Sequence, residues 1–136
     1  MIQYLALLAT ASLFGGMLLF SFGFAPIVFH SFPSNEASRF IRLVFPWYYL
    51  FVISVSALSC LALVPLKLIS AALIGTVAII GLFARQILMP RINSARDLQL
   101  LGDKSARGRF GRLHGLSVFL NFGQLAITGY VLICFL

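Results

Sequence analysis

Residues 114–128 read HGLSVFLNFGQLAIT, a stretch that combines the hydropathy of a membrane-spanning helix with a regular series of polar side chains. The polar residues are His114, Ser117, Asn121, Gln124 and Thr128. Their alternating spacing of three and four places them along one face of a helix, which we call the polar stripe. Because an unpaired polar group in hydrocarbon is costly, we expect this face to point toward other helices or a wet cavity.

The composition predicts an integral membrane protein. Hydrophobic residues make up 61% of the 136 residues and charged residues only 10%, which is outside the range of soluble domains. A helix needs about 20 apolar residues to cross a bilayer, so the chain has room for about four spans. We therefore predict an all-α, antiparallel four-helix bundle that forms a single domain, 1–136. The predicted spans are 2–30, 43–64, 67–89 and 113–136.

The first span begins at the initiator methionine without a basic n-region or a small-residue cleavage site. We interpret it as a retained helix rather than a cleaved signal peptide. The two halves of the chain do not match residue by residue, so we expect no internal repeat.

The basic residues predict the orientation of the bundle. Nine of the ten lysine and arginine residues lie in or next to segments 31–42 and 90–112, and only Lys67 lies on the opposite side. By the positive-inside rule, these segments are two basic cytoplasmic loops and both termini face outward. We expect the protein to lie in a bacterial inner membrane, and we expect the basic cytoplasmic rim of the bundle to attract anionic lipid head groups. No recognition motif accompanies the charge, so we expect no nucleic-acid partner.

Small and aromatic residues predict how the helices pack. Gly16, Gly75 and the Gly111/Gly115 pair suit close approach of helices, either inside the bundle or at a homodimer face. Trp47, Tyr48 and Tyr49 suggest an aromatic belt at the level of the lipid head groups.

Four further residues are candidates for a site. Two of them share the predicted depth of the start of the polar stripe, and two lie near the opposite surface. His30 ends the first span and Arg85 lies near the end of the third, so with His114 they belong to the cytoplasmic level. His30 and His114 are candidate metal or haem ligands, and Arg85 either snorkels or binds a carboxylate or phosphate. Cys60 and Cys134 share the outer level, where a disulfide or a copper(I) site is the alternative to two separate thiols. The spacing leaves open whether any of these residues touch.

The acidic residues argue against two classes of function. All three of them, Glu36, Asp97 and Asp103, lie in the predicted cytoplasmic segments. The predicted membrane core therefore contains no carboxylate for a proton relay or a hard cation, which argues against a proton-coupled cation pump. The sequence also lacks a recognisable nucleophile with its base, a P-loop or a dinucleotide fingerprint, so it points away from an enzyme.

Four segments resemble a known family: FGFAPIVFHSFP (22–33), FPWYY (45–49), ILMPRINSARD (87–97) and GRLHGLSVFLNFGQL (111–125). They are similar to the transmembrane protein 205-like family, small four-span proteins classed as a domain of unknown function. This resemblance implies a four-helix membrane fold and a distant relationship to the copper resistance protein D group and to the haem-associated four-span protoporphyrinogen oxidase. Asn93 is among the residues that carry the resemblance, and we include it in the candidate ligand-binding set. The chain lacks the early span histidine and the paired acidic and lysine residues of the oxidase, so that activity is not carried over.

These observations lead to three hypotheses. In the first, the bundle binds a metal ion, haem or another small ligand through His114, Asn121 and their neighbours near the cytoplasmic leaflet, with haem or copper as possible cofactors. In the second, the protein is a non-catalytic accessory or scaffold subunit of a larger membrane complex, and the polar stripe only holds helices together. In the third, it is a transporter or efflux component that acts as an oligomer.

Overall fold

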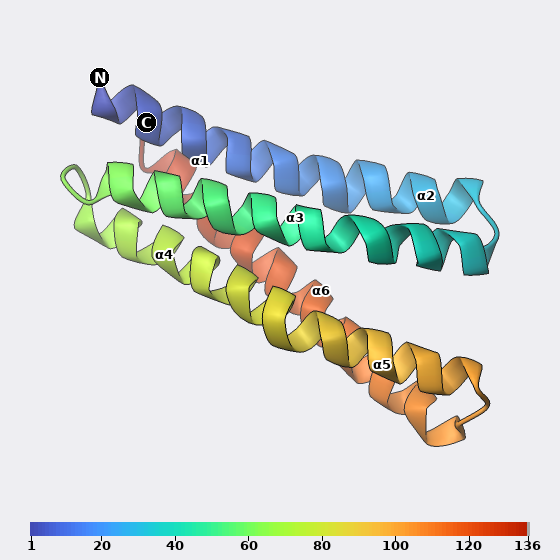
Figure 1. The fold of residues 1–136 in the computed structure, drawn as a ribbon. Helices are drawn as coiled ribbons and strands as arrows, with labels where there is room; N and C mark the ends of the chain where they lie inside the picture. Colours follow the sequence, from blue (N-terminus) through green and yellow to red (C-terminus); the bar gives the residue numbers. More distant parts are fainter. Residues whose placement is uncertain (136) are drawn as a thin grey trace.

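The computed structural model describes residues 1–135 and is made of four long helices joined by short turns (Figure 1). The first helix consists of α1 (Ile2–Leu18), the π-helical segment η1 (Leu19–Phe24) and α2 (Ala25–Ser31), and the second is α3 (Ser34–Leu63). The third consists of α4 (Leu68–Phe83), the π-helical segment η2 (Ala84–Leu88) and α5 (Met89–Leu100), and the fourth is α6 (Lys104–Ile133). All four are long and apolar enough to cross a membrane, which confirms the predicted all-α membrane fold.

The helices extend well beyond the predicted spans. α3 begins at Ser34 and continues through Pro46, and α6 begins at Lys104, so most of the two predicted loops is helical. Hydropathy detects only the part of a helix that lies in hydrocarbon, and these helices continue as polar helices past that boundary. Only short turns remain at 32–33 and 101–103. Leu136, the predicted end of the fourth span, lies outside the described residues.

The turn before α6 has a well-defined cap. Gly102 has a φ of 95°, in the left-handed region that favours glycine, and it follows Leu101, the C-cap of α5. The Asp103 carboxylate then accepts hydrogen bonds from the backbone N–H groups of Ser105 and Ala106 and from the Ser105 hydroxyl. The Ser105 hydrogen bonds hold the pKa of the Asp103 carboxyl below its usual value.

The bundle is closed at one end and open at the other. The two termini and the α3–α4 turn lie together at the closed end (Figure 1). At the opposite end the α2–α3 pair diverges from the α5–α6 pair. Buried apolar residues fill the closed end and the middle, among them Leu13, Met17, Leu63, Ile74 and Val131. The termini therefore share one end, as predicted, whereas the membrane side that this end faces stays a prediction from the charge distribution.

Glycines allow close approach only in the closed part of the bundle. A Cβ atom at Gly16 would lie 2.5 Å from the Phe51 ring of α3, and one at Gly75 would lie 3.4 Å from the Cys60 sulfur. Cβ atoms at Gly111 and Gly115 would meet nothing within 4 Å. The predicted packing role is therefore confirmed for Gly16 and Gly75, whereas the Gly111/Gly115 pair makes no close contact inside the described chain.

This difference gives a matched pair of variants on α1. We expect Gly16→Ala to destabilise the protein by about 1 kcal/mol, because the new methyl group forces the Phe51 ring to move in a packed interface. Gly15→Ala, where a Cβ meets no atom within 4 Å, serves as the control and is expected to be neutral or slightly stabilising. Thermal unfolding in one mild detergent measures both, and equal melting temperatures for the two variants would contradict this account of the α1–α3 contact.

The order of elements repeats in the two halves of the chain, which corrects the expectation of no internal repeat. Each half has an α-helix, a π-helical segment, a helix with proline near its start, a turn and a 30-residue helix. Buried positions on the first and third long helices also correspond, with one constant separation along the chain. These pairs are Ala6 and Ser70, Thr10 and Ile74, Leu13 and Val77, and Met17 and Gly81. Both halves start at the closed end, so they run in the same direction (Figure 1).

Prolines explain why the π-helical segments occur where they do. η1 ends two residues before Pro26, and η2 ends two residues before Pro90. Proline has no N–H group, and its ring clashes with the carbonyl four residues earlier. The wider turn of a π-helix provides room for that ring while the chain stays helical. Both widened turns lie where the two halves begin to diverge.

Candidate functional site: a cavity at the open end

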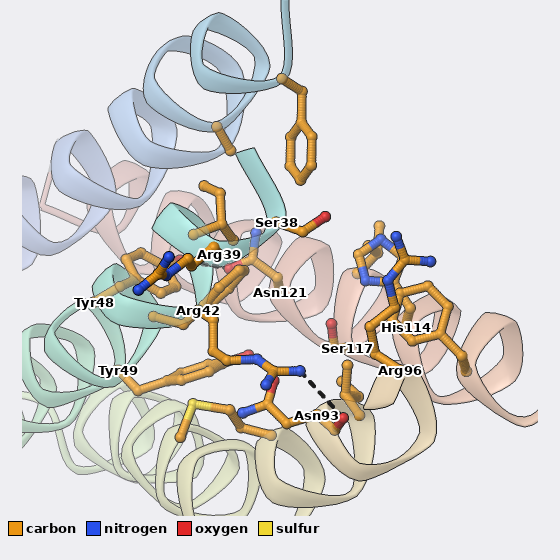
Figure 2. A pocket seen from close by; sticks show the side chains of 18 of the residues that line it. Ser38, Arg39, Arg42, Tyr48, Tyr49, Asn93, Arg96, His114, Ser117 and Asn121 are labelled. Carbon is orange, nitrogen blue, oxygen red and sulfur yellow. Dashed lines mark hydrogen bonds between the residues drawn. The ribbon is translucent and has the colours of Figure 1, made fainter. Parts of the chain in front are cut away.

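The open end contains a cavity of about 580 Å³ that all four long helices line. Figure 2 shows its labelled polar side chains around a common space, with Arg42 and Asn93 on one side and Ser117, His114 and Arg96 on the other. The cavity lies between the two repeated halves, because η1, α2 and α3 line one side and α5 and α6 line the other. We call it the vestibule.

The charge of the vestibule is mainly positive. Three arginines line it, Arg39 and Arg42 from α3 and Arg96 from α5, together with one acidic residue, Asp97. Arg42 donates a 2.8 Å hydrogen bond to the Asp97 carboxylate and a 3.2 Å bond to the Asn93 carbonyl. This is the one ion pair that the described residues form, and it links the two halves across the opening. Arg39 and Arg96 therefore keep positive charge that no carboxylate in residues 1–135 neutralises.

The floor of the vestibule is a hydrogen-bonded network of neutral side chains. The Tyr48 hydroxyl donates a 2.5 Å bond to the Asn121 side-chain oxygen, and the Asn121 amide nitrogen donates a 2.8 Å bond to the Ser21 hydroxyl. The Tyr48 ring stacks on Phe20, with ring centres 4.0 Å apart. Phe20 and Ser21 both belong to η1, so the π-helical turn helps to position the floor. The network joins three of the four long helices.

Tyr48 and Tyr49 correct the predicted aromatic belt. Trp47 is 71% exposed, as a belt residue should be, but Tyr48 and Tyr49 are only 7% and 5% exposed. Three consecutive helical residues cannot share one face, because each is rotated by about 100° from the last. The two tyrosines therefore turn into the bundle, where they line the vestibule.

A stack of three side chains forms one wall of the vestibule. The Arg96 guanidinium lies 5.4 Å from the centre of the Phe110 ring, in cation–π geometry. The His114 ring stacks on the same Phe110 ring, with the two ring centres 5.7 Å apart. Arg96 is also held by a 3.0 Å hydrogen bond to the Gln99 side chain. These contacts fix the Arg96 head group beside the cavity.

Most of the remaining lining is apolar. Phe20, Phe29, Phe45 and Val118 are among the residues that surround the polar groups. A concave apolar surface with a few arginines and amides suits a molecule that combines an apolar body with an anionic group. The planar guanidinium groups suit a carboxylate or a phosphate in particular, because they bind these anions through two parallel hydrogen bonds.

The polar stripe faces the interior, and the structure divides it into two parts. His114, Ser117 and Asn121 line the vestibule. Gln124 and Thr128 lie below it, toward the closed end, and are 2% and 0% exposed. The Gln124 amide donates a 2.9 Å bond to the Val77 carbonyl of α4, whereas Thr128 donates to the Gln124 carbonyl of its own helix. Gln124 therefore links α6 to α4, and neither Gln124 nor Thr128 lines the cavity.

The other candidate residues have separate surroundings. Asn93 lines the vestibule, but His30 and Arg85 do not. His30 is exposed in the last turn of α2, and the half-buried Arg85 donates a 3.4 Å hydrogen bond to the Pro46 carbonyl. The structure thus gives no cluster of His30, Arg85 and His114, because these residues point from different helices toward different surroundings.

The two cysteines form no disulfide. Cys60 and Cys134 are both free and half-buried. The Cys60 thiol donates to the Ala71 carbonyl, and the Cys134 carbonyl accepts a hydrogen bond from Lys67. Within residues 1–135, no three His, Cys, Asp or Glu side chains gather in a way that could hold a metal ion. The vestibule itself offers His114 and Asp97 as its metal-binding residue types.

Sequence reasoning missed several residues that define the vestibule. Arg39, Arg42 and Arg96 were used only to predict the orientation in the membrane. Ser21 lies inside an apolar span and was not noticed as a polar residue. One signal was present in the sequence: Arg39, Arg42 and Arg96 all lie within about two helical turns of the ends of the predicted spans. Continuing the helices past the apolar region would have placed these arginines around the mouth of the bundle.

Residues 8–99 match the family described as domain of unknown function DUF4149, which covers more than half of the chain. The chain belongs to this family. Most of the vestibule lining from η1, α2, α3 and α5 lies inside the DUF4149 match, whereas α6 follows it. No curated protein matches the chain, and no solved structure does. The DUF4149 family description assigns no activity, and the resemblance to the transmembrane protein 205-like family stays a prediction.

Proposed function

We propose that the protein binds a small amphipathic molecule with an anionic group in the vestibule, at the cytoplasmic boundary of a bacterial inner membrane. One observation carries the proposal: Arg39 and Arg96, without a carboxylate partner in residues 1–135, line an otherwise largely apolar cavity of about 580 Å³. The anionic group binds between the guanidinium groups, and the apolar body lies against the phenylalanines. Asn121 and its neighbours at the floor set the depth that the ligand reaches.

This proposal narrows the metal, haem or small-ligand hypothesis to a small organic anion. The basic and apolar lining supports an organic anion more than a metal ion, because metal ions are held by imidazole, thiolate and carboxylate groups. Haem is an amphipathic anion too, and His114 is the vestibule residue that could bind its iron. Absorbance and elemental analysis of the purified protein test this alternative. A Soret band that is lost in His114→Ala, or bound copper, would replace the proposal by a cofactor site.

The direct test compares charged and uncharged ligands of the same chain length. Lauric acid and dodecyl phosphate serve as anionic probes, with methyl laurate and dodecanol as their uncharged counterparts. Native mass spectrometry of the protein in a mild non-ionic detergent measures the fraction of protein that retains each probe. We expect retention of both anionic probes and little retention of the uncharged ones. Equal retention of all four would contradict an anion-selective vestibule.

Transport of the same ligand is a second candidate, which the repeated halves support. Many transporters place their substrate site between structural repeats that run in the same direction and rock against each other. The vestibule lies between such halves and is closed below by Gln124 and its neighbours. Loss of signal from NBD-labelled phosphatidylglycerol after dithionite addition to reconstituted vesicles would measure movement of an anionic lipid between leaflets. No acceleration over protein-free vesicles would leave binding without transport of this lipid.

A further inference from the structure

A second concavity lies between α5 and α6, separate from the vestibule. Its volume is about 440 Å³. Six residues line it, Pro90, Arg91, Ser94 and Ala95 from α5 and Arg109 and Leu113 from α6. None of them lines the vestibule. We call this concavity the outer groove.

The chemistry of the outer groove suits a phosphate group. Arg91, Ser94 and Arg109 are exposed, and none of the described residues that line the groove is acidic. Two guanidinium groups and a hydroxyl provide several hydrogen-bond donors for one anion. The nearby Asp103 carboxylate accepts the capping hydrogen bonds of α6, and its pKa is lowered mainly by the Ser105 hydrogen bonds and least by the charge of Arg109. Neither Arg91 nor Arg109 forms a salt bridge with a carboxylate of residues 1–135.

The depth of the outer groove matches the level of lipid head groups. Arg91 and Pro90 directly follow the apolar part of the third helix, and Leu113 begins the apolar part of the fourth. Leu116 is 41% exposed and continues the same face of α6, one turn deeper. A molecule whose phosphate lies at Arg91 and Arg109 would thus place an acyl chain along Leu113 and Leu116.

We propose that the outer groove binds the phosphate of an anionic phospholipid, with the acyl chain on the adjacent face of α6. Basic pockets between membrane helices on the cytoplasmic side commonly bind anionic head groups. The groove is particular to the second half of the chain. At the repeat-related positions, Ile27 and His30 replace Arg91 and Ser94, so the first half has no equivalent pair of cations with a hydroxyl.

The test compares lipid retention by two pairs of variants with the same loss of charge. Full-length protein is reconstituted in vesicles of phosphatidylcholine with phosphatidylglycerol, extracted in a mild detergent and analysed by native mass spectrometry. Wild type is expected to retain phosphatidylglycerol in preference to phosphatidylcholine. The Arg91→Gln/Arg109→Gln variant is expected to retain it about thirtyfold less, because each arginine near the surface contributes about 1 kcal/mol. The Arg107→Gln/Arg112→Gln control removes two exposed arginines outside the groove and is expected to behave like wild type.

Three results would overturn the proposal. The first is equal loss of phosphatidylglycerol in both pairs of variants, which would mean that only the total charge matters. The second is equal retention of phosphatidylcholine by wild type. The third is displacement of the lipid by millimolar inorganic phosphate, which would make the groove a site for a soluble anion. If Arg91→Gln/Arg109→Gln fails to fold, Arg91→Lys/Arg109→Lys keeps both charges and is expected to retain phosphatidylglycerol, and its loss would equally contradict the proposal.

Discussion

Replacing Arg39 and Arg96 together by glutamine is expected to weaken binding of lauric acid and dodecyl phosphate by at least about a hundredfold. Each guanidinium group provides charge-assisted hydrogen bonds worth about 1.5–3 kcal/mol, and the variant removes both groups that lack a carboxylate partner in residues 1–135. Retention of dodecanol should change little, because its hydroxyl carries no charge. Native mass spectrometry with increasing probe concentration gives the affinities.

The control for this experiment is Arg107→Gln. Arg107 is an exposed arginine near the start of α6 that does not line the vestibule. We expect this variant to bind the anionic probes as wild type does. Similar weakening in Arg107→Gln and in Arg39→Gln/Arg96→Gln would mean that the net charge of the protein, and not the vestibule, attracts the probes.

The change Asp97→Asn is expected to act in the opposite direction and to strengthen binding of the anionic probes by about tenfold or more. It removes the only carboxylate that lines the vestibule among residues 1–135 and releases Arg42, which then adds a charge-assisted hydrogen bond to the ligand. The effect on stability should be small, because the side chains of Arg42 and Asp97 are 38% and 55% exposed and such pairs contribute about 0–1 kcal/mol. Melting temperatures and probe affinities are measured on the same preparation.

A double variant separates the two parts of this explanation. In Asp97→Asn/Arg42→Gln no released guanidinium group is present, so most of the gain in affinity should disappear. An Asp97→Asn variant that binds the anionic probes more weakly than wild type would contradict the assignment, because it would make Asp97 a ligand-binding group rather than a competitor for Arg42.

The sequence was sufficient to predict the helices that lie in the membrane and the interior direction of the polar stripe. Hydropathy depends on local composition, and the spacing of Ser117, Gln124 and Thr128 is a property of one helix. Both can therefore be evaluated without knowing which helices pack against it. The burial of these three residues follows from the cost of placing polar groups in lipid. The sequence also predicted that both termini lie at the same end of the bundle, because a chain that crosses an even number of times returns to the side where it started.

The vestibule was harder to predict because it depends on how helices diverge. Apolar spans give no information about the polar ends of α3, α5 and α6, where Arg39, Arg96 and His114 lie. The π-helical segments depend on Pro26 and Pro90 in helices that otherwise appear uninterrupted. Depth alone allowed a cluster of His30, Arg85 and His114 and left open whether they touch, because the direction of a side chain also depends on helix rotation. The repeat was missed because it is preserved in the order of elements and the buried positions, with few identical residues.

The most direct measurement is the identity of the small molecules that accompany the protein from its own membrane. Solvent extraction of the purified protein, followed by mass spectrometry, is carried out on wild type and on Arg39→Gln/Arg96→Gln. We predict an amphipathic carboxylate or phosphate that is enriched in wild type over the surrounding membrane lipid and depleted in the variant. Extracts of identical composition from both proteins, matching the bulk membrane, would contradict the assignment of the vestibule as an anion-binding site.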